Sequence, residues 1–234
     1  MSSAGSPGWN FRMRRMFGRI SPRYDLVNTL MTFGRDQAWR RMTLAAASPP
    51  RGGLLLDVGT GTGRIALEAA RQDPDLTVVA LDLTPEMLKL GKRTDADGRI
   101  LWVNGDALDL PFSDGLFDAV TSGYLLRNVP DMHLALKEQL RVVRPGGRVA
   151  FLDTSPPRSP VLRPFIRVYF RVVIPLLGGL ISGQWEAYRY LPHSTEAFRT
   201  PEELREIMAR AGFTDIRSRS LMFGTMVLMS GARS

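Results

Sequence analysis

The chain has 234 residues, of which 44% are hydrophobic and 23% are charged, as expected of one folded α/β domain with some chain left over for a cap or lid. It contains no cysteine and only two histidines, which excludes disulfides, thiolate zinc sites and a cysteine nucleophile, and no metal is predicted. The formal net charge of +8 favours anionic partners, namely nucleic acid, an acidic membrane surface or a phosphate-bearing ligand.

The basic charge is concentrated in two segments. Residues 1–24 carry five arginines and no acid, and four arginines lie between Asp153 and Glu186, again with no acid. Each run is interpreted either as a solvated face or as a contact with an anionic partner. No continuous apolar segment opens the chain, so no secretory signal is predicted and the cytoplasm is the expected location.

The first predicted helix follows a segment, residues 1–9, that is expected to lack regular structure. From Arg23 to Ala47 the pattern is helical. The apolar stripe of this helix is expected from Leu26, Leu30, Phe33 and Trp39. A proline- and glycine-rich stretch at 48–53 then ends it.

Short apolar runs then alternate with helical stretches, which is the pattern of a parallel α/β sheet. Strands are predicted at Leu54–Val58, Thr77–Leu81, Ile100–Asn104, Phe117–Ser122 and Val149–Asp153. Helices are predicted at Arg64–Arg71, Pro85–Gly91, Met132–Val143 and Pro201–Ala211. Two closing strands, Ile216–Leu221 and Thr225–Met229, are predicted to form a hairpin.

Residues 156–195 break this alternation with six prolines and an apolar segment, Val161–Ile181. A transmembrane span is not predicted, because three arginines interrupt the segment and are costly to bury in lipid. The four-residue spacing places Arg163, Arg167 and Arg171 on one helical face. The opposite face would carry Phe165, Val168, Tyr169 and Val172. The segment is therefore an amphipathic helix that either caps the domain or lies on a membrane. The chain divides into a cap, 1–50, and a main domain, 51–234, that includes this insertion.

A glycine-rich turn follows the first predicted strand at Gly59, Gly61 and Gly63. Glycine permits a close approach of backbone to ligand and a positive φ. The spacing differs from the dinucleotide fingerprint, since Arg64 stands at the position of its last glycine. A cofactor without a pyrophosphate does not need that geometry.

Acidic residues follow the next two strands. Asp82 ends the second strand, where a carboxylate can accept both ribose hydroxyls, and Asp106 follows the third, where it can accept from an adenine amino group while Ala107 flanks the ring. The carboxyl ends of strands are where α/β sheets bind ligands. These features resemble the class I S-adenosylmethionine-dependent methyltransferases. The resemblance implies a three-layer Rossmann-like fold with seven strands, the last antiparallel, together with N-terminal helices and a lid insertion. The predicted cofactor site comprises Asp57, Gly59, Thr60, Gly61, Thr62, Asp82, Leu83, Asp106, Ala107 and Gly123.

Four further segments narrow the resemblance: Tyr24–Asn28 with Trp39 downstream, Leu126–Val129, Arg141–Gly147 followed by Asp153 and Ser155, and Tyr188–Leu191. Together they are similar to the signatures of the ubiquinone/menaquinone biosynthesis C-methyltransferases. The family usually has Met where Val27 stands, His where Asp36 stands, and Glu where Asp153 and His193 stand.

This resemblance implies methylation of a ring carbon on a polyprenylated quinol such as demethylmenaquinol. Arg127 is the predicted stabiliser of a phenolate, although it could instead pair with Asp131. Asn128 is predicted to orient a ring oxygen, and Tyr24 to close over the reacting groups unless it is a core residue. His193 is the candidate base. Because a prenylated substrate stays in the bilayer, the basic segments are expected to give peripheral membrane contact.

Three alternatives stand. The acceptor could be a soluble aromatic or natural-product molecule, with residues 156–195 as a simple lid. The positive charge prompts nucleic-acid methylation, but Leu126–Val129 stands where base methyltransferases carry an Asn/Asp-Pro-Pro-Tyr/Phe motif, so no nucleic-acid partner is predicted. The domain could also bind its cofactor without catalysis. The oligomeric state is left open, with a homodimer as one candidate.

Overall fold

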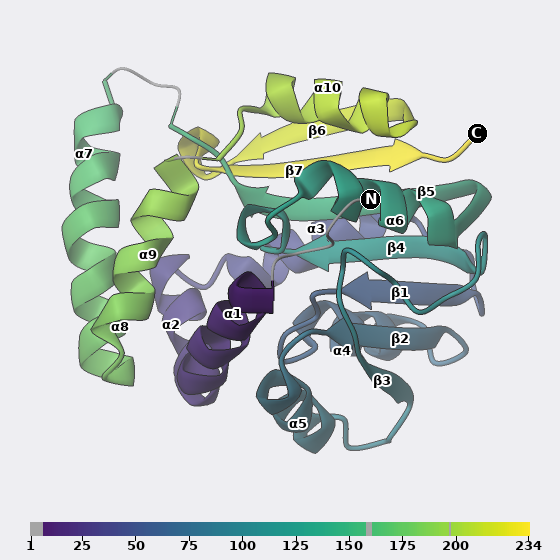
Figure 1. The fold of residues 1–234 in the computed structure, drawn as a ribbon, viewed down its shortest axis with the longest axis horizontal. Coiled ribbons are helices and arrows are strands. Elements are labelled where there is room, and N and C mark those ends of the chain that lie inside the picture. The colour runs from purple at the N-terminus through teal and green to yellow at the C-terminus, as the bar shows by residue number, and fades with distance from the viewer. Residues whose placement is uncertain (1–6, 158–160, 197) are drawn as a thin grey trace.

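The computed structural model describes residues 7–157, 161–196 and 198–234. Its centre is a seven-stranded sheet in the order β3-β2-β1-β4-β5-β7-β6 (Figure 1). The strands are β1 (Leu54–Val58), β2 (Thr77–Asp82), β3 (Ile100–Asn104), β4 (Phe117–Gly123), β5 (Val143–Thr154), β6 (Thr214–Leu221) and β7 (Met226–Ala232). Within this sheet β7 runs in the direction opposite to the other strands and pairs antiparallel with β5 and β6, so the predicted fold and closing hairpin are confirmed.

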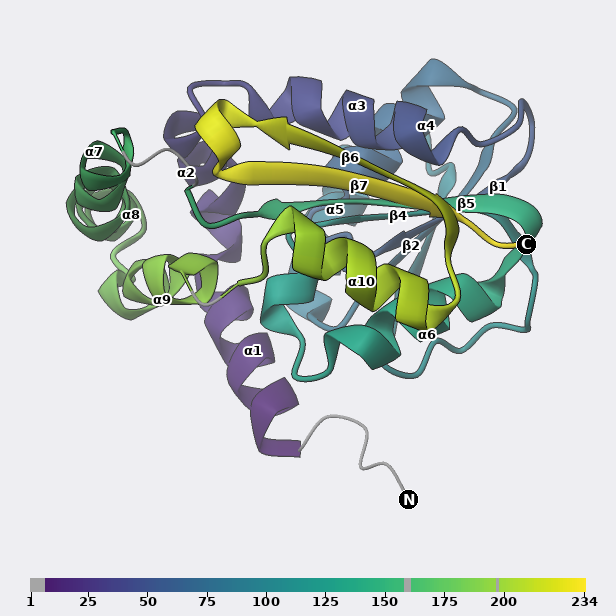
Figure 2. The same cartoon turned by 90° about the horizontal axis from the view of Figure 1, so that it is seen from above.

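Helices cover both faces of the sheet, as Figure 2 shows from above. On one face lie α3 (Asp36–Ala47) and α4 (Arg64–Gln72), and on the other lie α6 (Met132–Val142) and α10 (Pro201–Ala211). Helix α5 (Pro85–Thr94) packs beside β2 and β3. Burial on both faces explains why the central strands read as continuous apolar runs.

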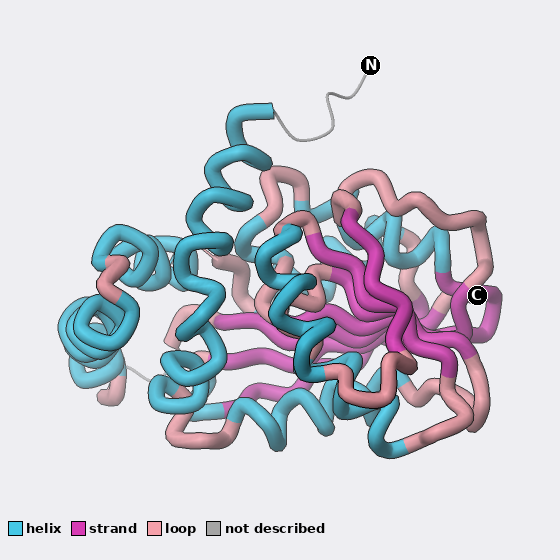
Figure 3. The backbone as a smooth tube through the Cα atoms, turned by 90° about the horizontal axis from the view of Figure 1, so that it is seen from below, coloured by secondary structure: helices cyan, strands magenta, loops and turns pink. Residues whose placement is uncertain are grey.

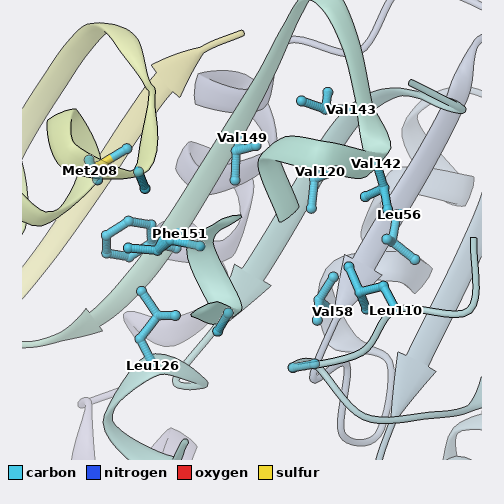
Figure 4. Packing of buried hydrophobic residues seen from close by; sticks show 14 of the residues in the cluster. Leu56, Val58, Leu110, Val120, Leu126, Val142, Val143, Val149, Phe151 and Met208 are labelled. Atoms are coloured by element: carbon cyan, nitrogen blue, oxygen red, sulfur yellow. The ribbon is translucent and has the colours of Figure 1, made fainter. Parts of the chain in front are cut away.

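The larger core cluster lies between the sheet and the α6–α10 layer. Figure 4 shows Met208 and Leu126 on either side of Phe151, and all three side chains are buried. On the opposite face, Leu44 and Ala47 of α3 pack with β1 and β2. Helix α3 is therefore part of the layered domain rather than a detached cap.

The N-terminal region departs from the prediction. Helix α1 (Pro7–Ile20) was not predicted, and its first residues lie in the segment expected to lack regular structure. Two helices, α2 (Tyr24–Met31) and α3, replace the single predicted one, with Phe33 and Gly34 at positive φ between them.

The predicted apolar stripe of this region is wrong except for Trp39. Leu26, Leu30 and Phe33 are 51%, 45% and 71% exposed. The buried side chains of α2 are instead Val27 and Met31, which pack with α1 and α8. One continuous helical pattern cannot describe both α2 and α3, because Trp39 of α3 packs in a different cluster, against β5 and β7.

The remaining helices lie beyond the carboxyl ends of the parallel strands, next to α1 and α2 (Figures 1 and 3). Helix α7 (Arg163–Val168) continues through a π-helical turn, Tyr169–Val173, into α8 (Ile174–Ser182), and α9 (Trp185–Glu196) folds back on it. Gly178 and Gly179 permit this return, since a Cβ at either position would collide with the ring of Tyr188 or Trp185. Of the predicted apolar face, only Tyr169 packs against the domain, while Phe165, Val168 and Val172 are exposed.

Candidate active site

The first cavity lies at the carboxyl ends of β1–β4 and has a volume of about 90 Å³. Seven of the predicted cofactor residues line it: Gly59, Gly61, Asp82, Leu83, Asp106, Ala107 and Gly123. Parallel strands bring these residues together because their carboxyl ends share one edge of the sheet.

The glycine turn forms one wall of the first cavity. Gly59 and Gly61 have φ of +65° and +59°, and a Cβ at Gly59 would collide with Leu125. The Gly61 N–H donates to Asp82 Oδ2 at 2.8 Å, and no atom lies within 4 Å of where a Gly61 Cβ would stand. The turn therefore presents bare backbone to the cavity.

The other three predicted cofactor residues lie behind this wall. Asp57 is buried and accepts from Thr60 Oγ1 at 2.6 Å and from Thr121 Oγ1 at 2.9 Å. Burial raises the pKa of Asp57 to about 6, although both hydroxyls oppose the shift. Thr62 donates to the Asp25 carboxylate at 2.9 Å, which ties the turn to α2. In this geometry Asp57, Thr60 and Thr62 hold the turn in place.

Asp82 and Asp106 are positioned as a nucleoside site requires. Asp82 Oδ1 accepts from Thr84 N at 2.7 Å, and burial raises the pKa of this carboxyl against its backbone hydrogen bonds. Asp106 Oδ1 accepts from Leu108 N at 3.0 Å, while Oδ2 accepts from the Asn10 amide at 2.7 Å. Asp106 thus accepts from an amino group at this cavity, so its chemistry fits the nucleoside part of S-adenosylmethionine.

Helix α1 roofs the first cavity with residues that the sequence did not identify as site residues: Trp9, Asn10, Met13 and Phe17. Arg14 anchors the helix through hydrogen bonds to Leu83 O at 2.8 Å and Asn104 Oδ1 at 3.1 Å. Met13, Phe17 and Ile20 have the i, i+4, i+7 spacing of a helical face, a signal that the arginines around them obscured.

A second cavity, of about 30 Å³, adjoins the first and shares Phe17, Tyr24 and Asn128 with it. Its other walls come from α1, α2, α9 and the turn after β4. Tyr24 is half-buried and lines both cavities. The cavities thus provide two adjoining compartments, one with the carboxylates Asp82 and Asp106 in its wall and one with the Arg127 side chain.

Arg127 lines the second cavity as a buried cation. Its Nη1 donates to Asp153 Oδ1 at 2.8 Å, so the alternative pairing with Asp131 is wrong, and Asp131 instead caps α6. Burial lowers the pKa of Arg127, but the charge and hydrogen bond of Asp153, together with Tyr24 and Tyr124, outweigh burial and hold the pKa above its usual value. The guanidinium lies over the Tyr124 ring at 5.1 Å. Arg127 is therefore a fixed positive charge and not a base.

Asn128 already makes hydrogen bonds within the protein, which the sequence did not predict. Its side-chain amide donates to Tyr124 O at 2.8 Å, and its backbone oxygen accepts from the Trp9 indole at 3.1 Å. One of its two side-chain N–H groups is thus used within the protein. His193 lies in α9, but its side chain is outside the described part of the structure, so its role as a base stays a prediction. Among the described residues, no group of acidic and histidine side chains could hold a metal ion.

The fold and these cavities define a class I S-adenosylmethionine-dependent methyltransferase. Comparison with known families narrows the class: the model of the ubiE/COQ5 methyltransferase family matches residues 9–233. The chain belongs to this family.

Curated relatives agree along nearly the whole chain. A demethylmenaquinone methyltransferase of Thermus thermophilus is 46% identical over 93% of this chain and 100% of its own length. A demethylmenaquinone methyltransferase of Roseiflexus castenholzii is 43% identical over 94% of this chain and 93% of its own length. A ubiquinone/menaquinone biosynthesis C-methyltransferase of Desulfotalea psychrophila is 44% identical over 94% and 90%.

Solved structures share the fold at lower identity. A SAM-dependent methyltransferase of Thermotoga maritima has a TM-score of 0.66 at 17% identity, covering 95% of this chain and 100% of that one. A TM-score of 0.66 is also found for a chain from the complex of the Haloferax volcanii Trm112 activator with a methyltransferase. That chain is 20% identical, and the match covers 92% of this chain and 96% of that one. At this identity the likeness supports the fold alone.

Proposed function

We propose that this enzyme transfers the methyl group of S-adenosylmethionine to a ring carbon of a polyprenylated quinol precursor such as demethylmenaquinol. The names of the curated relatives support this acceptor. The observation that carries the proposal within the fold is the second cavity, where a buried cation, Arg127, faces an otherwise largely apolar compartment that adjoins the nucleoside site.

Methyl transfer to a ring carbon needs a methyl donor, a nucleophilic ring carbon and removal of the ring proton. Bound S-adenosylmethionine supplies a methyl group on a sulfonium, ready for in-line displacement. A ring hydroxyl that loses its proton makes the neighbouring ring carbon nucleophilic, so the protein must favour the phenolate and align that carbon. When the carbon has taken the methyl group, its ring hydrogen leaves as a proton and the aromatic ring is restored.

The residues around the second cavity divide these tasks. The fixed charge of Arg127 stabilises the phenolate, in the manner of an oxyanion hole. Tyr24 and Asn128, which face both cavities, hold the ring against the cofactor compartment. His193 is proposed to accept the ring proton.

We propose further that the enzyme works at a membrane surface. The helical stretch Arg163–Ser182 is long enough to cross a membrane, and its 18-residue window has a mean hydropathy of 1.6. Only 22% of that window is buried. Its exposed apolar side chains continue onto Phe33, whose ring stacks on Tyr169 at 5.9 Å. The exposed apolar surface comprises Leu26, Leu30, Phe33, Phe165, Val168, Val172, Leu176 and Leu180. Beside it lie Arg163, Arg167 and Arg171, which suit an anionic lipid surface.

The acceptor assignment is tested with labelled S-adenosylmethionine and three acceptors: demethylmenaquinol, a demethoxy-type benzoquinol, and a soluble naphthol without a prenyl tail. Transfer to a prenylated quinol in preference to the naphthol is expected. Transfer to the tail-less naphthol alone would overturn the acceptor assignment and leave the cofactor assignment standing.

A further inference from the structure

The second cavity holds a polar group that the proposed transfer does not yet use. Asn28, on α2, lines this cavity, and its side-chain nitrogen is buried without a hydrogen-bond partner among the described residues. Buried amide groups are nearly always paired in folded proteins. An unpaired one beside a ligand compartment is accounted for when the ligand supplies the acceptor.

The helical spacing of α2 explains how Asn28 reaches the cavity. Tyr24, Asn28 and Met31 stand at i, i+4 and i+7, and all three line it. Val27, which is fully buried, and Met31 also pack α2 against its neighbours, so the orientation of this face is fixed by packing.

Arg127 offers a second donor to the same compartment. Its Nη1 is used by Asp153, but its Nε is buried and has no partner in the described part of the chain. Asn128 differs from both, because its side-chain nitrogen already donates to Tyr124 O. Among the described residues, the buried donors without a partner at this cavity therefore include Asn28 Nδ2, Arg127 Nε and the Tyr188 hydroxyl.

The other walls are apolar or aromatic, with Phe17, Ile20 and Ala187 among them. A compartment with apolar walls and unpaired donors is complementary to an aromatic ring that carries oxygen substituents. The present volume of about 30 Å³ holds about two water molecules, so a ring enters only as the walls open.

We propose that Asn28 Nδ2 donates a hydrogen bond to an oxygen of the acceptor ring, alongside the donation from Arg127 Nε, and that Asn28 thereby selects oxygenated rings. This inference rests on the proposed function for its acceptor class. It assigns a binding role to a residue on the N-terminal helices, outside the sheet-edge loops where the sequence placed most of the site.

The test compares Asn28→Leu, which removes the donor at similar volume, with Asn28→Asp, which keeps the shape but offers only acceptors. Thr29→Val is the matched control, since Thr29 lies on the same helix and lines neither cavity. Both Asn28 variants are expected to lower kcat/KM for demethylmenaquinol about 10- to 100-fold. Affinity for S-adenosylhomocysteine, measured by calorimetry, is expected to stay within about twofold of the wild type for all three variants.

A second readout does not need turnover. With S-adenosylhomocysteine bound, the wild type is expected to bind 1-naphthol more tightly than naphthalene, and both Asn28 variants to reduce that affinity ratio about tenfold. Because the ratio is taken on one protein sample, a loss of folded protein cancels. An unchanged ratio in both variants would overturn the inference. Absence of methyl transfer by the wild type, with the ratio still reduced in the variants, would contradict the proposed function alone.

Discussion

Among single residues, Arg127 is the side chain on which the proposed transfer depends most. Its replacement by Gln removes a fixed positive charge from the second cavity, and loss of one such donor typically lowers kcat by about 10²- to 10³-fold. We expect that loss for Arg127→Gln, with affinity for S-adenosylhomocysteine close to that of the wild type, as measured by steady-state kinetics and calorimetry.

Arg141→Gln is the matched control for this variant. Arg141 is also an arginine with carboxylate partners, Glu138 and Asp114, but it lies outside both cavities. Its variant should keep kcat near that of the wild type. Equal losses of kcat in the two variants would show that the Arg127 effect is general damage to folding.

Asp57 is expected to make stability depend on pH. Burial raises its pKa from 3.8 to about 6, so between those pH values the folded protein holds a proton that the unfolded chain has released. This contribution to the free energy of unfolding therefore falls as pH rises from about 4 to about 6, by at most about 3 kcal/mol. The Asp57→Asn variant should lose this fall, which denaturant unfolding without cofactor at several pH values measures.

The control for the Asp57→Asn variant is a carboxyl group that is exposed to solvent. Asp97, whose side chain is 70% exposed, provides it. Asp97→Asn should follow the wild type across the pH range. If the stability difference between Asp57→Asn and the wild type stays constant from pH 4 to pH 6, the buried carboxyl does not titrate as described.

Local spacing was enough to predict one set of site residues and not the other. Gly59, Gly61 and Asp82 follow strand ends, so their place at the sheet edge follows from the topology alone. Asn10 and Asn28 reach the same cavities only because α1 and α2 fold back across the strand ends. No periodicity in the sequence determines that packing.

Among the helices, α1 covers the first cavity with Trp9, Asn10, Met13 and Phe17. Arg14 holds it to the loop after β2 and to the end of β3 through two hydrogen bonds. Removing such exposed bonds is expected to weaken cofactor binding about five- to tenfold. Arg14→Ala should therefore raise the Kd for S-adenosylhomocysteine in calorimetry, while Arg15→Ala, an exposed change of the same charge on the same helix, should not. Equal Kd values for the two variants would mean that α1 does not hold the cofactor.

The helical stretch 163–182 carries the membrane prediction. Each basic residue near an anionic surface contributes about 1 kcal/mol. Changing Arg163, Arg167 and Arg171 to Glu should abolish co-sedimentation with vesicles that contain acidic lipid. The charge-matched control changes three exposed basic residues of α5, namely Lys89, Lys92 and Arg93, and should still sediment. Wild-type binding that is indifferent to acidic lipid would rule out the electrostatic part of this proposal.

The same stretch shows why an amphipathic pattern is ambiguous in sequence. The periodicity predicts the arginines on one face and Phe165, Val168 and Val172 on the other, but an apolar face can point into a protein or out of it. In the structure Ile174 is buried against the domain, whereas those three side chains are exposed.

At the scale of the whole molecule, alternation of apolar runs and helices predicted the sheet well, because burial on both faces leaves a strong signal. The strands β1 and β3 have the predicted bounds, and β7 is antiparallel as expected. The sequence could not predict how α1, α2 and α9 meet beyond the strand ends (Figure 1). That arrangement forms walls of the second cavity and places it against the first.

The proposed function is methylation of a ring carbon where the first and second cavities adjoin. The most direct measurement supplies S-adenosylmethionine with a trideuterated methyl group and demethylmenaquinol, then follows the product by mass spectrometry before and after mild oxidation. The account predicts that one deuterated methyl replaces one ring hydrogen, and that the product still oxidises to a quinone because both ring oxygens remain unmodified. A product of the same mass that resists oxidation would carry the methyl on oxygen and would contradict the account.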